Sequence, residues 1–181
     1  MRYFYSLESS DLGTFSLVWI ELNNKIKIVR VLLPETRPNL ILKIKNEYPS
    51  AKKSDSLEEL ASEIKKLISG EEIKFNLGLL DFDLCTDFEK KVLIADYNIP
   101  MGYVSTYSRI AKSIGVPKGA RAVGNALANN PFPLIIPCHR VIRSDGRLGG
   151  FGGGLEMKKK LLENEGIFLS DGKVNEAKIY Y

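Results

Sequence analysis

Residues 119–141 read GARAVGNALANNPFPLIIPCHRV, and this stretch carries the strongest signals for both fold and chemistry. Its first part predicts a helix from about Gly119 to Asn129. Its second part places a thiol beside the chain's only histidine, at Cys138 and His139. A thiol must lose its proton to become a good nucleophile, and an imidazole or a nearby cation such as Arg140 promotes that loss. The stretch therefore joins a helix to a candidate activated thiol.

A second short helix is expected just before this one, capped by Ser105 or Thr106 and ending at Gly115. Two short helices joined by a tight Gly-Pro turn predict a helix-turn-helix. The helix at 119–129 carries two stripes at i, i+4 spacing, one of small residues and one of polar residues. A bare face allows close approach to a nucleic-acid groove or to another helix, and the adjacent Arg121 favours the groove. The stripes are Ala120, Gly124 and Ala128, and Arg121, Asn125 and Asn129.

Charge is spread unevenly along the chain. Between Asp96 and Glu156 there are seven basic residues and one acidic residue, a net charge of +6, whereas the whole chain carries +4. A local basic block of this kind suits a polyanion such as DNA or RNA, although chance clustering on a solvated surface gives the same count. The basic residues are Arg109, Lys112, Lys118, Arg121, Arg140, Arg143 and Arg147.

The sequence predicts two domains and a short connector. Residues 1–78 form an α/β accessory domain, with strands at 14–19 and 25–31 around a turn at Asn23-Asn24, a helix at 56–69 and a strand at 72–77. Residues 79–86 form the connector. Residues 87–181 form the second domain. Its helices are expected from a capping box at Thr86 to about Asn98, then at the two helix-turn-helix positions, then at 155–165, with a short strand at 134–136. The C-terminal tail either docks or stays loose.

Composition narrows the class of protein. Apolar and charged contents of 44% and 27% are typical of a globular protein. No apolar run is long enough for a membrane span or a signal peptide, so we expect a cytoplasmic protein with no membrane partner. Cys85 and Cys138 are expected to be reduced thiols, Cys85 being structural. With two cysteines and one histidine, we expect no zinc site and no bound metal.

If the strand at 134–136 continues through Cys138 and His139, the thiol and the imidazole cannot form a direct hydrogen bond. Adjacent residues on a strand point to opposite faces, so either the chain bends after Pro137 or a water bridges Cys138 and His139. A histidine base also needs a carboxylate to fix its tautomer, and Glu163 and Glu165 are candidates. The plain alternative is a structural cysteine beside a surface histidine.

Residues 86–166 resemble the O6-alkylguanine-DNA alkyltransferase family. The resemblance is carried by Arg121–Gly124, Asn130-Pro131, Pro137–Val141 and Leu161–Gly166. It implies a ribonuclease-H-like α+β N-terminal domain followed by a mainly α winged helix-turn-helix. It also implies direct repair of double-stranded DNA by a monomer without a cofactor. One alkyl group passes from O6 of a flipped guanine, or O4 of thymine, to Cys138.

The resemblance assigns roles residue by residue. Cys138 is the alkyl acceptor, His139 the base that acts through a water, and Glu165 the carboxylate that orients it. Asn130 braces the segment before the thiol, and Arg121 is the finger that enters the duplex. The remaining substrate- or DNA-binding residues are Tyr107, Ser108, Ala122, Pro133, Val141, Ser144, Leu148, Phe151 and Gly152.

This chain departs from the family at Phe151 and Gly152, where many members have tyrosine and serine. The Gly152 amide can still contact O6, so altered pocket size or affinity is expected rather than lost activity.

Three alternatives stay open. A non-catalytic relative that binds alkylated DNA would lack the acceptor cysteine. A winged-helix regulator with an incidental thiol would not need Asn130, His139 and Glu165 together. A cysteine hydrolase usually draws its histidine from a distant part of the chain.

Overall fold

In the computed structural model, which describes residues 2–22, 25–174 and 179–181, the chain divides into two units. The first runs to Leu84 and includes Pro131–Pro133, and the second holds Cys85–Asn130 and Leu134–Tyr181. Most of the expected connector, residues 79–84, therefore belongs to the first unit. The Asp81 N–H donates to Ile28 O at 2.9 Å there, and the Phe82 ring meets Phe132 edge-on.

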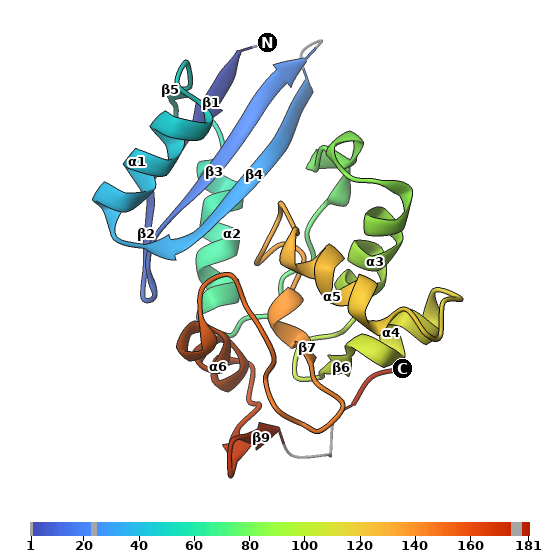
Figure 1. The fold of residues 1–181 in the computed structure, drawn as a ribbon. Coiled ribbons are helices and arrows are strands. Elements are labelled where there is room, and N and C mark those ends of the chain that lie inside the picture. Colours follow the sequence, from blue (N-terminus) through green and yellow to red (C-terminus); the bar gives the residue numbers. More distant parts are fainter. Residues whose placement is uncertain (1, 23–24, 175–178) are drawn as a thin grey trace. The chain divides into compact units, whose positions relative to one another are not determined.

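A five-stranded sheet is built around β3 (Gly13–Leu22) in the first unit, as Figure 1 shows. Residues 15–20 of β3 are all buried, so both faces of the strand are covered and the expected half-buried alternation is wrong. Strand β4 pairs antiparallel along one edge of β3, and β1 and β2 pair along the other. The other strands are β1 (Tyr3–Tyr5), β2 (Glu8–Ser10), β4 (Lys25–Glu35) and β5 (Lys52–Lys53), which runs parallel to β1.

Two helices complete this unit, α1 (Arg37–Glu47) and α2 (Glu58–Ile68). Helix α2 was expected from its periodic apolar face. Helix α1 was not, because its buried Leu40 and Ile44 are interleaved with an exposed Leu42, which blurs the amphipathic pattern. Short 3-10 turns η1 (Leu77–Leu79) and η2 (Phe82–Leu84) follow. The strand expected at 72–77 is wrong, since the backbone there is irregular, and the turn expected at Asn23-Asn24 lies outside the described residues.

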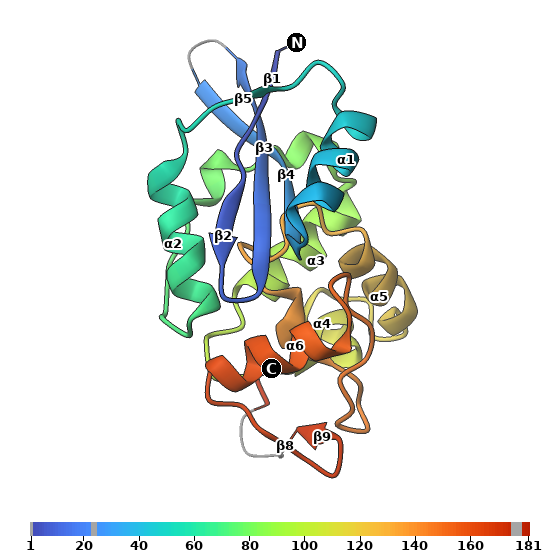
Figure 2. The same ribbon diagram turned by 90° about the vertical axis from the view of Figure 1, so that its left-hand side faces the viewer.

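Three helices open the second unit: α3 (Asp87–Tyr97), α4 (Tyr107–Ser113) and α5 (Ala120–Ala128). The capping box is confirmed, because the Glu89 N–H donates to the Thr86 hydroxyl while the Glu89 carboxylate accepts from the Thr86 N–H. Thr106 is the cap of α4, through the Arg109 N–H. Helices α4 and α5 pack on each other and on α3 (Figures 1 and 2).

The rest of this unit wraps around those helices. A 3-10 turn, η3 (Cys138–Arg140), leads into β7 (Val141–Ile142), which pairs in parallel with β6 (Ser105–Thr106). Helix α6 (Leu155–Asn164) packs against η3 and is followed by the hairpin of β8 (Leu169–Ser170) and β9 (Lys173–Val174). A buried cluster joins these parts: Val104, Ile142, Leu148, Leu162, Ile167 and Val174.

The described end of the C-terminal tail is docked on this unit. The Tyr180 N–H donates to Val104 O at 2.7 Å, and the Ser105 hydroxyl donates to Tyr180 O at 2.9 Å. The Tyr181 hydroxyl donates to Ala95 O at 2.7 Å. Among the residues that the structure describes, none of the helices is long and apolar enough to span a membrane.

Candidate active site

The thiol sits at the start of a turn, not on a strand. The strand expected at 134–136 is wrong, because Leu134 has a φ of +75° and reverses the chain there. The Cys138 N–H then donates to Ile136 O at 2.9 Å, and the Arg140 N–H donates to Pro137 O at 2.8 Å. The chain thus bends after Pro137. Cys138 stays partly exposed while the two residues after it are buried.

Asn130 fixes this turn to the end of α5. Its side-chain amide is buried and donates to Ile136 O at 3.2 Å, two residues before the thiol. A buried carbonyl that loses its donor costs the desolvation of that group. Asn130 therefore helps to hold the segment that leads to Cys138.

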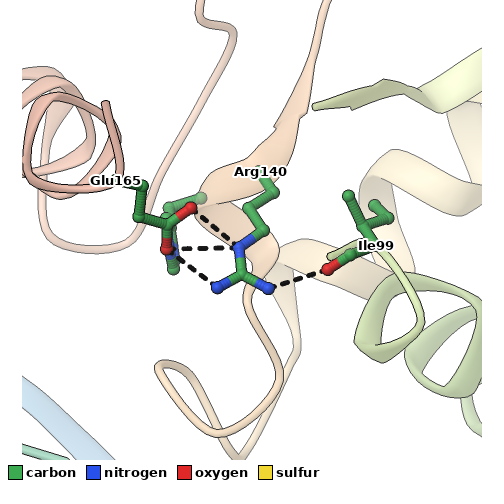
Figure 3. A network of polar contacts seen from close by, with 4 residues as sticks. Ile99, Arg140 and Glu165 are labelled. Atoms are coloured by element: carbon green, nitrogen blue, oxygen red, sulfur yellow. Dashed lines mark hydrogen bonds and ion pairs between the residues drawn. The ribbon is translucent and has the colours of Figure 1, made fainter. Parts of the chain in front are cut away.

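A buried network is formed by His139 and Arg140, the two residues that follow the thiol, together with Glu165 and Ile99 (Figure 3). The His139 Nε2 and Glu165 Oε1 atoms are 2.8 Å apart, with His139 fully buried. The Arg140 guanidinium donates to both oxygens of Glu165, at 2.9 Å from Nε to Oε2 and 2.9 Å from Nη2 to Oε1. Its Nη1 donates to Ile99 O at 2.7 Å. Glu165 is therefore the carboxylate that contacts the imidazole, and the positive charge of Arg140 balances the negative charge of Glu165.

These contacts determine the charge of the His139 ring and which of its two nitrogens carries the proton. Burial raises the pKa of Glu165, but His139 and Arg140 outweigh it and lower that pKa to about 2. Burial lowers the pKa of His139, so the ring is neutral near pH 7. Because the ionised carboxylate can only accept, Nε2 carries the proton and Nδ1 keeps its lone pair. Nδ1 is buried and has no hydrogen-bond partner among the described residues, so it is available as a base.

The thiol itself is protonated at rest. Burial raises the pKa of Cys138 to about 12, and the Asp96 carboxylate acts in the same direction. A hydrogen bond from the Asn130 side chain and the Lys158 charge oppose this. Arg140, which we expected to act on the thiol, is instead committed to Glu165. Cys138 therefore needs a base that removes its proton during reaction.

A cavity of about 370 Å³ opens over the thiol. Gly124 and Ala128, two of the three residues in the small stripe of α5, line one side of the cavity. Tyr107 and the glycine-rich loop, residues 145–154, line the other side. The lining residues are Tyr107, Gly124, Leu127, Ala128, Cys138, Gly150, Phe151 and Gly152.

Lys158 holds the loop in place, a role that the sequence did not reveal. It is fully buried, and its ammonium group donates to Val141 O at 2.7 Å and Gly150 O at 3.1 Å. It belongs to a run of three lysines, which is typical of a solvent-exposed helix face, so no local signal marked it. The carbonyl of Val141, one of the residues expected to contact the substrate, thus already accepts one hydrogen bond.

The other expected residues are spread over the same unit, with one exception. Leu148 is buried, whereas Arg121, Ala122 and Ser144 are exposed. Ser108 lies beside the cap of α4, its hydroxyl 3.0 Å from that of Thr106. Pro133 belongs to the first unit. Of the seven basic residues between Asp96 and Glu156, only Arg140 is buried.

Gly149 is required where the loop approaches Tyr107. Its φ is +69°, and an added Cβ would lie 2.9 Å from the Tyr107 hydroxyl. We expect Gly149→Ala to lower the free energy of unfolding by about 1–2 kcal/mol through the left-handed backbone alone. Urea unfolding measures it, with Gly150→Ala as control, since a Cβ there meets no atom within 4 Å. Equal losses in the two variants would contradict the assigned strain.

Comparisons with known proteins agree on one family. The family described as 6-O-methylguanine DNA methyltransferase, DNA binding domain, matches residues 87–167. A methylated-DNA–protein-cysteine methyltransferase of Methanothermobacter thermautotrophicus is 46% identical over 114 residues, 63% of this chain. The match spans 64% of that relative's length.

Solved structures match more of the chain. The O6-methylguanine methyltransferase of Mycobacterium tuberculosis is similar over 90% of this chain and 92% of its own, with 31% identity and a TM-score of 0.71. The same organism's OGT, solved in complex with DNA, is similar over the same shares, with 30% identity and a TM-score of 0.73.

Proposed function

Because this chain belongs to the methylated-DNA–protein-cysteine methyltransferase family, we propose that it repairs alkylated DNA by moving the alkyl group from O6 of guanine to Cys138. One observation carries the proposal. Residue Cys138 is partly exposed and lines a cavity, and the next residue is a buried histidine whose Nε2 meets Glu165 and whose Nδ1 has no hydrogen-bond partner among the described residues. That arrangement suits a thiol that must be deprotonated only when a substrate is bound.

The proposed reaction needs no cofactor. The Cys138 proton passes through a bridging water to His139 Nδ1, and the sulfur electron pair forms a bond to the alkyl carbon. The bond from that carbon to O6 breaks and its electrons stay on the base. The guanine anion takes up one proton from solvent and His139 returns the thiol proton to solvent, so the protons balance. A thioether has no easy route back to a thiol, so each molecule acts once. Alkyl groups on O4 of thymine would react in the same way.

The substrate base must leave the duplex to reach the thiol, which costs a few kcal/mol. We infer that α4 and α5 form the helix-turn-helix of a winged domain and that the first unit is ribonuclease-H-like. The exposed basic residues support a DNA partner, as does the DNA complex of the M. tuberculosis relative. A single acceptor site requires no second subunit, and a thiol that must stay reduced favours the cytoplasm.

Single use distinguishes this function from its rival, a non-catalytic protein that binds alkylated DNA. Duplex DNA with one O6-methylguanine is mixed with the protein at several ratios, and restored guanine is measured. We expect the guanine formed to equal the protein added and then stop. Bound but unrepaired DNA at every ratio supports the rival, and repair beyond one event per molecule contradicts an irreversible thioether.

Arg121 is exposed near the start of α5 and is the proposed finger that replaces the flipped nucleotide. We expect Arg121→Ala to slow repair of duplex DNA by about tenfold or more, because flipping loses its stabilisation. Reaction with the free base O6-benzylguanine should stay unchanged, because no flipping is needed. Rates on both substrates measure it, with the exposed Lys112→Ala as control. Equal losses on both substrates would argue against a finger.

A further inference from the structure

Asp96 is a buried carboxylate for which the proposed reaction has no use. It lies on the last turn of α3 with no exposed surface. Neither of its carboxylate oxygens has a hydrogen-bond partner among the described residues. An ionised carboxylate removed from water without a partner is strongly disfavoured, and the C-terminal end of a helix disfavours it further. Its protonation state is therefore set by its surroundings.

The nearby cations do not pair with Asp96. Arg140 and Lys158 both lower its pKa, but their hydrogen bonds go to other acceptors: Glu165 and Ile99 O for Arg140, and two carbonyls for Lys158. Helix α5 also packs on α3, and its one charged residue, Arg121, is exposed and not among the groups that act on Asp96. The groups whose pKa Asp96 raises come from η3, α4, α6 and the tail: Cys138, Tyr107, Lys158 and Tyr181.

Burial raises the pKa of Asp96 to about 8, against the two cations. The proton is therefore lost close to the pH range in which a DNA-repair protein works. Helix α3 packs directly on η3, where Cys138 lies. A negative charge at this range disfavours a second one, so ionised Asp96 opposes formation of the thiolate.

We propose that Asp96 is a positioning residue that acts through Cys138: its ionised carboxylate holds the sulfur in the thiol form, and its neutral form releases that restraint. The inference rests on the proposed function only for what the restrained thiol does, since the charge effect of Asp96 on Cys138 is the same whatever the substrate. Such a restraint acts as the pH rises through about 8, where it opposes the gain in thiolate that a higher pH would otherwise bring. The chemistry of Cys138 then depends on a group outside the cavity lining.

Iodoacetamide tests this without DNA. The thiolate sulfur displaces iodide, one S–C bond forms, and the thiol proton goes to the buffer. Alkylation is followed by peptide mass, so that Cys85 serves as the internal reference thiol. We expect Asp96→Asn to react at Cys138 as fast as the original protein at pH 6, where Asp96 is already neutral. At pH 9 it should react about threefold faster, because the gain in thiolate fraction is partly offset by a less nucleophilic thiolate.

Two comparisons keep the test decisive. Asp87→Asn makes the same chemical change at an exposed position of α3 and should leave both rates unchanged. The second comparison uses the original protein alone and so needs no folded variant. When the logarithm of its Cys138 alkylation rate is plotted against pH, the rate at pH 9 should lie about threefold below the straight line extended from low pH. An equal rate ratio at pH 6 and pH 9, or a straight line for the original protein, overturns the proposal.

Methyl transfer from O6-methylguanine DNA separates this inference from the proposed function. A pH-dependent effect of Asp96 on iodoacetamide, with no methyl transfer in any variant, supports the inference and refutes the proposed function. Normal methyl transfer with no effect of Asp96 on iodoacetamide at either pH overturns the inference and leaves the function standing.

Discussion

Replacing Cys138 by alanine is expected to abolish methyl transfer from O6-methylguanine DNA, a loss of at least about 10³-fold, because the variant lacks the thiol that receives the methyl group. Cys138 is the thiol that lines the cavity and lies beside the imidazole network. Binding to duplex DNA should stay within about twofold, since affinity comes mainly from phosphate contacts. Transfer of labelled methyl to protein and a gel-shift titration measure the two quantities.

The matched control is Cys85→Ala. Cys85 is the chain's other thiol and lies outside the lining of this cavity. We expect Cys85→Ala to transfer methyl at the original rate. Transfer that survives in Cys138→Ala, or that is lost in Cys85→Ala, would show that the acceptor has been assigned to the wrong residue.

Glu165→Gln is expected to destabilise the protein more than any other single change considered. The variant leaves the buried Arg140 guanidinium without its counter-charge, and breaking a buried ion pair from one side costs about 3–5 kcal/mol. The His139 ring also loses the carboxylate that fixes its tautomer, so methyl transfer should fall by about 10²-fold or more. Urea unfolding and single-turnover kinetics measure the two losses at pH 7.

The pH dependence of this loss follows from the sign of the shift. The pKa of Glu165 falls from 4.5 to about 2 on folding, so ionised Glu165 stabilises the native state above about pH 4.5. That contribution is lost as the pH drops towards 2. The difference in unfolding free energy between the original protein and Glu165→Gln should therefore shrink from pH 7 to pH 3.

Glu163→Gln is the control for this variant. Glu163 lies on α6, and within the described part of the chain its side chain forms a solvent-accessible pair with Lys159 at 3.9 Å, so its loss should cost less than about 0.5 kcal/mol. A pH-independent difference for Glu165→Gln, or one no larger than that of Glu163→Gln, would contradict the role of the buried pair.

Local sequence signals predicted those elements whose ends and faces are set locally. The capping box at Thr86 marked α3, and the apolar periodicity at 57–68 marked α2. Helix α1 was not predicted, because its apolar residues do not lie on one face of the helix. The run at 134–136 favours a strand on its own, yet tertiary structure overrides it: Leu134 is fully buried in a left-handed conformation, and Asn130 binds Ile136 O.

Some residues of the site could likewise be predicted from local sequence signals, and others only from the fold. Cys138 and His139 were visible as neighbours, whereas the choice of Glu165 over Glu163 came from the family resemblance and not from spacing. Arg140 was interpreted as a cation for the thiol, but its geometry serves Glu165. Lys158 and Asp96 gave no signal, because a buried lysine and a buried aspartate look like surface residues until the fold is known.

Peptide mass analysis after reaction with O6-methylguanine duplex DNA tests the central claim most directly. We predict that the peptide containing Cys138 gains the mass of one CH₂ unit, in proportion to the guanine restored, and that the peptide containing Cys85 gains nothing. Repaired DNA with an unmodified Cys138 peptide, or a methyl group on any other residue, would contradict the account.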